Sequence, residues 1–261
     1  MPPSERTLYQ FPVSHYCEKA RWLLDAKGLP YTLRNLMPGA HRRVTKRLAK
    51  GRGSVPVLVD GDVALGDSTE IALHLERTYP SPPLLPPPGP EHDRALELED
   101  YFDEVGVHVR RWAYGHIIQG GANLGLLMFR EYPAPQQWFG RMLTPVIKAV
   151  LRRQYRIYPP KVEESRVKVL AGLDRLEREI QNDPSRYLVG SSLTLADITA
   201  ASLFSPIARL EGSPYANRED MPPPKAMAEM AEEVRARPAG QWLQRLYHQH
   251  RQPTQSFPRA A

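Results

Sequence analysis

The feature that most constrains this fold is a proline-rich segment about a third of the way along the chain. Seven of the eleven residues from position 80 to position 90 are prolines. Proline has no backbone N–H and a fixed φ, so this segment cannot form a helix interior and favours a stiff, extended link. We therefore predict one domain over residues 1–79, a linker over 80–90, a second domain over 91–252 and a loose tail over 253–261.

Before the linker, strand patterns and helix patterns alternate. Short runs of β-branched and apolar residues predict strands, and apolar residues on one helical face predict helices. A strand, a helix and a second strand with short links form a βαβ unit, so the first two strands should be parallel. Asp60-Gly61-Asp62 is a turn signal between two apolar runs, which predicts a β-hairpin. The predicted order is β-α-β-α-β-β-α, with strands at 7–11, 31–35, 56–59 and 63–65 and helices at 14–27, 41–50 and 68–78.

After the linker, the pattern is helical. Apolar stripes with helical spacing occupy residues 98–112, 162–180 and 227–234, and such stripes are typical of helix faces that pack on a core. The segment over residues 113–160 is long, its apolar pattern is less regular, and it contains several glycines and prolines. The fold class predicted from both halves is an α/β domain followed by an all-α domain.

The composition excludes several classes of protein. Hydrophobic residues make up 41% of the chain and charged residues 25%, as in an ordinary soluble globular protein. No run approaches the roughly 18 apolar residues that a membrane-spanning helix needs, and the first residues lack the apolar region of a signal peptide. The single cysteine, Cys17, rules out an intrachain disulfide and a four-cysteine zinc site. We expect a cytoplasmic protein with no bound metal and no membrane partner.

The positive charge is concentrated in two short segments. The net charge is +6, and basic residues gather over 41–50 and over 152–156. They could be solvated helix faces, a site for a small anionic ligand or a nucleic-acid surface. Because no zinc-finger spacing and no RNA-binding aromatic signature is present, we expect no nucleic-acid partner.

Ser14 places a hydroxyl where the first strand turns into the first helix. Unpaired N–H groups at a helix N-terminus carry about half a positive charge, which stabilises a thiolate and lowers its pKa. The Ser14 hydroxyl could donate a hydrogen bond to such a thiolate. Alternatively, Ser14 is only the N-cap of the helix, because serine is a common cap residue.

Two further segments could hold a peptide-like ligand. Pro56 opens the third strand, and a cis Val55–Pro56 bond would turn the backbone of Val55 outward to pair with a ligand. Ser68 begins a helix whose N–H groups suit a carboxylate, and Asp67 beside it offers a negative charge to an ammonium group. An ordinary helix start, capped by Asp67 or Ser68, explains the second segment equally well.

In their order and spacing, these segments resemble the soluble glutathione transferase family. The resemblance rests on a serine–x–x–cysteine motif at the first helix, a Val-Pro pair, an acidic-Ser pair and the proline-rich link to a helical domain. It implies a thioredoxin-like first domain that binds glutathione. Val55 and Pro56 match the valine and cis-proline that pair with the cysteinyl backbone, and Asp67 and Ser68 match the pair that holds the γ-glutamyl head. Ser14 matches the thiol-activating residue of the serine-type classes.

The resemblance also implies a reaction and partners. The thiolate of glutathione, acting as co-substrate, would attack an electrophilic and apolar small molecule held by the helical domain, and the protein would form a homodimer. Basic residues over 41–46 are candidates for the glycyl carboxylate, and Thr194 and Asp197 match the family's capping box at the start of a buried helix. Candidates for the co-substrate pocket, by location only, are Tyr114, Met128, Phe129, Tyr132, Trp138 and Phe139.

Two positions bear on the type of chemistry. The tyrosine classes carry a catalytic tyrosine in the first strand, where this chain has Gln10, and Tyr9 should face the other side of the sheet. Serine chemistry is therefore favoured. Cys17 lies one turn into the first helix, where side chains are usually packed and inert. If it were reactive, the protein would be a glutathione-dependent thiol/disulfide reductase; a further alternative is a non-catalytic binding or scaffold protein.

Overall fold

The first part of the chain forms a four-stranded sheet with three helices. The structure is a computed structural model, and it describes residues 6–120, 124–129, 132–217 and 222–252. The predicted tail over 253–261 lies outside these residues. The elements follow the predicted order, as β1 Thr7–Gln10, α1 His15–Ala26, β2 Thr32–Asn35, α2 His41–Leu48, β3 Val57–Asp60, β4 Val63–Leu65 and α3 Ser68–Thr78.

The strand order is that of a thioredoxin-like sheet. The strands lie in the order β2-β1-β3-β4, with β1 parallel to β2 and antiparallel to β3. Leu8 of β1 lies opposite Leu33 of β2 and Leu58 of β3. Gly61 makes the β3–β4 turn with a positive φ of 59°, which glycine adopts without steric cost. The parallel pair and the hairpin predicted from sequence are both confirmed.

In the second part of the chain the described residues form helices and connecting loops without a strand, as predicted. It begins at Pro90, after a segment without helix or strand over 80–89. The helices are α4 Pro90–Gln119, α5 Leu124–Phe129, α6 Ala134–Met142, α7 Thr144–Gln154, α8 Pro159–Glu179, α9 Leu195–Ala208, α10 Lys225–Ala236 and α11 Pro238–His250. None of the described helices is both long enough and apolar enough to cross a bilayer.

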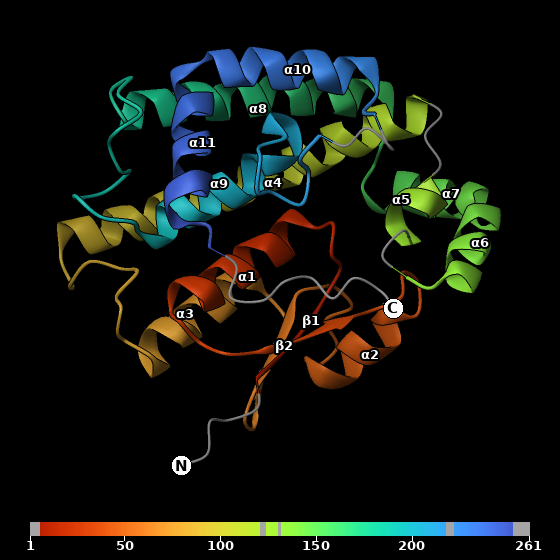
Figure 1. Ribbon diagram of the computed structural model, residues 1–261, viewed down its shortest axis with the longest axis horizontal. Helices are drawn as coiled ribbons and strands as arrows, with labels where there is room; N and C mark the ends of the chain where they lie inside the picture. Colours follow the sequence, from red (N-terminus) through yellow and green to blue (C-terminus); the bar gives the residue numbers. More distant parts are fainter. Residues whose placement is uncertain (1–5, 121–123, 130–131, 218–221, 253–261) are drawn as a thin grey trace.

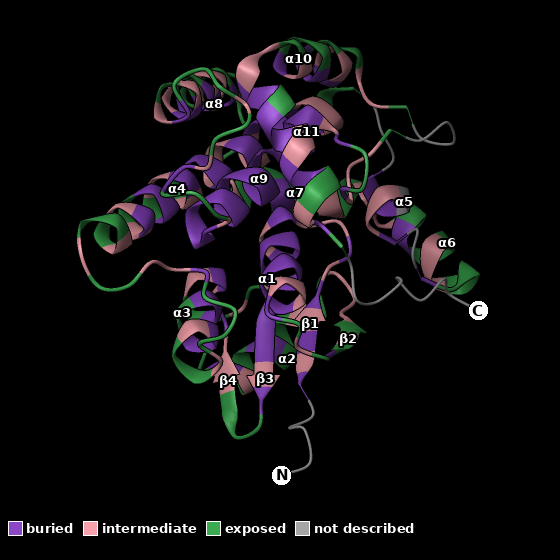
Figure 2. Ribbon diagram, turned by 60° about the vertical axis from the view of Figure 1, so that its left-hand side comes forward, coloured by how far each residue is buried: buried purple, intermediate pink, exposed green. Residues whose placement is uncertain are grey.

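Helix α9 forms the centre of the helical part. Every residue of α9 is buried, and the helix packs on α4, α10 and α11 and also on α1 of the first part. Figure 2 shows this buried helix above α1, and Figure 1 shows α1 between the sheet and the helical part. The expected capping box starts α9: the Asp197 carboxylate accepts the Thr194 N–H at 2.8 Å.

Polar contacts join α1 to the helical part. The Lys19 ammonium pairs with the Glu99 carboxylate and, at 2.9 Å, with the Asp103 carboxylate of α4. The Tyr16 hydroxyl donates to the Asp103 carbonyl at 3.0 Å. Lys19 is fully buried, and buried charges persist only when they are paired. These contacts therefore hold α1 against α4.

Candidate functional site

A cavity of about 500 Å³ opens where the two parts of the chain meet. The N-terminal end of α1, the start of α2 and the segment before β3 line it on one side. Helices α4, α5 and α7 line it on the other side. Its lining residues from the first part include Phe11, Pro12, Ser14, Tyr16, His41, Arg42 and Val55, and those from the second part include Arg110, Tyr114, Ile117, Met128, Phe129, Ile147, Tyr155 and Tyr215.

Ser14 is the N-cap of α1 and also lines the cavity. Its backbone is extended, with φ −147° and ψ 123°, and its Oγ accepts the Cys17 N–H at 3.4 Å. A hydroxyl that accepts through a lone pair keeps its own proton to donate. The cap function and the proposed hydrogen bond to a thiolate are therefore compatible.

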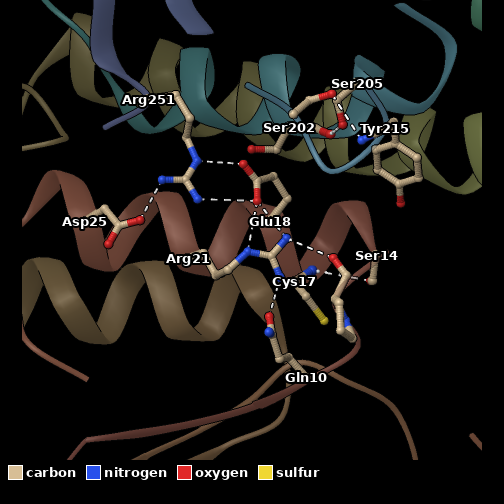
Figure 3. Close-up of polar contacts among 12 residues, drawn as sticks. Gln10, Ser14, Cys17, Glu18, Arg21, Asp25, Ser202, Ser205, Tyr215 and Arg251 are labelled. Carbon is tan, nitrogen blue, oxygen red and sulfur yellow. Dashed lines mark hydrogen bonds and ion pairs between the residues drawn. The ribbon is translucent and has the colours of Figure 1, made fainter. Parts of the chain in front are cut away.

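Buried ion pairs hold the turn before Ser14 in place. The Arg21 guanidinium donates to the Pro12 carbonyl at 3.3 Å and to the Glu18 carboxylate at 2.7 Å (Figure 3). Arg251, beyond the end of α11, donates to Glu18 and to Asp25, each at 2.6 Å. Burial alone would raise the pKa of Glu18, but the charges of Arg251 and Arg21 outweigh burial and lower it to about 2. These buried ion pairs were not predicted, because Arg251 is 233 positions from Glu18 and the burial of Arg21 depends on the tertiary fold.

The peptide bond between Val55 and Pro56 is cis, as the family resemblance implied. Val55 lines the cavity together with Gly53 and Ser54. Pro56 is buried and is not among the lining residues. The cavity thus brings together Val55 and Ser14, two of the residues predicted to bind glutathione.

Asp67 and Ser68 lie at the start of α3 and outside the cavity lining. The Asp67 carboxylate caps α3 by accepting the Thr69 N–H at 2.9 Å, and it pairs with Arg52 at 2.9 Å. Ser68 is buried. The Asp67 charge nevertheless helps to raise the pKa of the cavity residue Tyr16, after burial and the Asp103 charge. Neither residue of the pair is among those that line the cavity.

Comparison with known proteins decides the family. Residues 8–83 match the family model of the glutathione S-transferase N-terminal domain, and residues 143–226 match that of the glutathione S-transferase C-terminal domain. The chain belongs to the soluble glutathione transferase family. Both of its parts thus match the transferase pattern that the sequence motifs indicated.

Individual transferases resemble the chain to different extents. Glutathione S-transferase Z2 of Arabidopsis thaliana is 37% identical over 94 residues, which are 35% of this chain and 41% of that protein. A zeta-class glutathione S-transferase of Euphorbia esula is 27% identical over 73% of this chain and 71% of its own length. The crystal structure of a Methylobacterium radiotolerans glutathione S-transferase in complex with glutathione sulfonate has a TM-score of 0.55 and 21% identity, covering 99% of this chain and 100% of that one. The last likeness is one of fold.

Cys17 of this transferase-family chain does not line the cavity. Its side chain is fully buried, and burial raises the pKa of its thiol despite the nearby Arg21 charge and the Ser14 hydrogen bond. A thiol attacks as its thiolate, so a raised pKa makes it a poor nucleophile. The geometry favours packing as the function of Cys17.

The helical part supplies aromatic residues and one arginine to the cavity. The rings of Tyr114 and Tyr155 stack with 5.7 Å between their centroids, and Tyr215 also lines the cavity. Of the aromatic candidates named from sequence, Tyr114 and Phe129 line it, whereas Trp138 is 64% exposed. Tyr155, Tyr215 and Arg110 were not predicted, because no local sequence pattern marks which residues of the helical part face the cavity.

Proposed function

We propose that this protein is a glutathione transferase that joins the glutathione thiolate to an electrophilic carbon of a small molecule. The observation that carries the proposal is that Ser14, at the positive end of α1, and Val55, beside the cis-proline, line one cavity. The other side of this cavity consists mainly of apolar and aromatic residues of α4, α5 and α7. One side suits a peptide, and the other suits an apolar co-substrate.

Two groups would lower the pKa of the glutathione thiol. A fall of about two units below the free value of ~8.5 requires roughly 2.7 kcal/mol. A charge-assisted hydrogen bond from the Ser14 hydroxyl contributes about 1.5–3 kcal/mol, and the positive end of α1 contributes about 0.3–1 kcal/mol. Together these contributions amount to about 1.8–4 kcal/mol, a range that includes the required value.

The rest of glutathione would extend along the first domain. Its cysteinyl backbone pairs with Val55, and its γ-glutamyl head reaches Asp67 and Ser68 at the start of α3. His41 and Arg42 line the cavity and are the basic residues of the predicted segment that could meet the glycyl carboxylate. The related transferase solved with glutathione sulfonate supports this class of ligand. The same proposal includes the family's homodimer and a cytoplasmic location, which light scattering and cell fractionation would test.

The deciding experiment compares conjugation by wild type, Ser14→Ala, Ser14→Thr and Cys17→Ala with a panel of aryl halides. We expect Ser14→Ala to lower kcat/KM about 100-fold, as loss of one donor to a developing anion does elsewhere. Ser14→Thr keeps the hydroxyl and should restore part of the rate. Because Ser14→Ala also removes a helix cap worth about 1 kcal/mol, its thermal unfolding is measured alongside.

Other outcomes would point to the alternative functions. Loss of turnover in Cys17→Ala with full activity in Ser14→Ala would indicate a thiol/disulfide reductase. Glutathione binding by wild type without turnover of any electrophile would indicate a non-catalytic binding protein. The buried Cys17 thiol makes the first of these outcomes the less expected one.

A further inference from the structure

Arg110 of α4 lines the cavity, and its side chain has no polar partner among the residues that the structure describes. Its Nε is buried and has no hydrogen-bond partner, and none of the ion pairs among the described residues includes Arg110. The next residue on the helix, Arg111, is satisfied: its Nε donates to the Tyr155 carbonyl at 2.9 Å and its Nη1 to Ser165 at 3.1 Å. A buried donor without an acceptor is costly, and in native proteins it calls for an explanation.

The surroundings of Arg110 favour an anion of a particular kind. Its guanidinium lies 4.4 Å from the ring centroid of Tyr155 and 5.3 Å from that of Tyr16. Aromatic rings orient a guanidinium but do not neutralise its charge. A single guanidinium balances one negative charge, and its planar fork matches a carboxylate. The adjoining lining residues Ile117 and Ile147 are apolar, so they suit the body of such a molecule.

The position of Arg110 assigns it to the co-substrate. The groups proposed for glutathione, from Ser14 to Ser68, all belong to the first domain, whereas Arg110 belongs to α4. The charge of Arg110 also acts on the neighbouring His15: burial first, and Arg110 second, lower the pKa of His15 to about 3. His15 is therefore neutral at physiological pH, and Arg110 is the cation that α1 and α4 present there.

We propose that the co-substrate carries a carboxylate, bound by Arg110, on an aromatic or apolar body whose electrophilic carbon faces Ser14. This inference rests on the proposed function and narrows its substrate class. In the test reaction, the glutathione thiol releases its proton to solvent, the thiolate forms a C–S bond, and the aryl C–Cl bond breaks with loss of chloride.

The test uses two electrophiles that differ in one group, 4-chloro-3-nitrobenzoate and its neutral amide, 4-chloro-3-nitrobenzamide. Each enzymatic rate is divided by the rate of free glutathione thiolate with the same compound, which removes their difference in intrinsic reactivity. Wild type should prefer the benzoate, and Arg110→Met should reduce that preference about 10- to 100-fold by raising the KM for the benzoate. Arg110→Lys keeps the charge without the fork and should restore it in part. Arg166→Met is the control, because Arg166 pairs with Glu163 on α8 and is not a lining residue.

Each other outcome has a distinct meaning. Equal normalised rates for both compounds in wild type, or an equal loss with both in Arg110→Met, would overturn the inference and leave the proposed function intact. A raised KM for glutathione with an unchanged benzoate preference would place Arg110 in the glutathione site and would also overturn it.

If wild type turns over neither of these compounds nor any other aryl halide of the panel, the proposed function fails. In that case, calorimetry that compares the binding of 3-nitrobenzoate with that of 3-nitrobenzamide tests the inference independently of turnover. Tighter binding of the benzoate that disappears in Arg110→Met would support it, and equal binding of the two would refute it.

Discussion

At the scale of single residues, the negative charge of Glu18 is maintained by two arginines that are far apart in the sequence. It lies on α1 with 1% of its surface exposed, between the guanidinium groups of Arg21 and Arg251 (Figure 3). Its pKa of about 2 is lower than that of an unfolded glutamate, so the folded protein binds fewer protons in acid than the unfolded chain. Stability from this group is therefore present above about pH 4.5 and is lost as the pH falls towards 2.

We expect Glu18→Gln to lower the free energy of unfolding by about 3 kcal/mol at pH 7, because two buried guanidinium groups lose their shared carboxylate. The difference in the free energy of unfolding between this variant and wild type should decrease as the pH falls from about 4.5 to 3. Urea unfolding of both proteins at several pH values measures this difference. Glu163→Gln, which removes an exposed ion pair, should cost under about 1 kcal/mol at any pH. A gap for Glu18→Gln that stays constant with pH would contradict the assigned charge state.

Local sequence patterns predicted some site residues and could not predict others. Ser14 was identifiable because a cap residue is defined by its immediate neighbours. Arg110 was not identifiable, because its lack of a polar partner among the described residues depends on the fold. Arg251 was not identifiable, because its partners lie in a distant segment of the chain. Asp67 and Ser68 remain predictions: the structure shows their cap geometry at α3, and binding data must show their contact with a ligand.

At the scale of elements, the start of α9 is the most strongly specified helix end. Asp197 accepts hydrogen bonds from the Thr194 N–H and hydroxyl and from the Leu188 N–H, at 2.6–2.8 Å. Burial raises the pKa of Asp197 to about 6 although these hydrogen bonds oppose the shift. The motif therefore fixes the helix on which α1, α4, α10 and α11 all pack.

Thr194→Ala should lower the free energy of unfolding by about 1–2 kcal/mol, because it removes the cap hydroxyl from a buried helix start. Urea unfolding at pH 7 provides the measurement. The matched control is Ser191→Ala, an exposed residue three positions before Thr194, for which we expect a change within about 0.5 kcal/mol. Equal effects of the two substitutions would refute a structural function of the capping box.

Over residues 113–160 the sequence pattern was too irregular to predict individual helices. The apolar stripe ends at Trp112, yet α4 continues to Gln119, and three short helices follow. The last turns of α4 line the cavity, so the usual separation of apolar and polar faces is lost there. In α6 and α7 the large residues Trp138, Met142, Val146 and Val150 are exposed, which further obscures a helical stripe.

At the scale of the whole molecule, α1 joins the two domains into one structure. It packs on α3 of the first domain and on α9 of the second, and its fully buried Lys19 pairs with two carboxylates of α4. Unfolding of the helical domain would expose α1, separate Lys19 from the carboxylates of α4, and separate Glu18 and Asp25 from Arg251. The fold class was predictable from periodicity and the proline-rich link, but these contacts between distant residues were not.

We therefore expect both domains to unfold in one transition. Urea unfolding can be followed by tryptophan fluorescence and by far-ultraviolet circular dichroism, and the two curves should coincide. Trp22 reports on the first domain, and Trp112 and Trp242 report on the second. In the Trp22→Phe variant, fluorescence therefore follows the helical domain. Separate transitions for the two probes would contradict the coupling.

The pairing of Glu18 with Arg251 has a consequence for synthesis in the cell. The two residues are separated by 233 positions in the sequence. At about 5–20 residues per second, a ribosome adds Arg251 roughly 12–47 s after Glu18. During that interval Glu18 of the nascent first domain can pair with Arg21 but not yet with Arg251. The ion pairs between α1 and Arg251 therefore form only after this interval, during which chaperones could bind the exposed surface of α1.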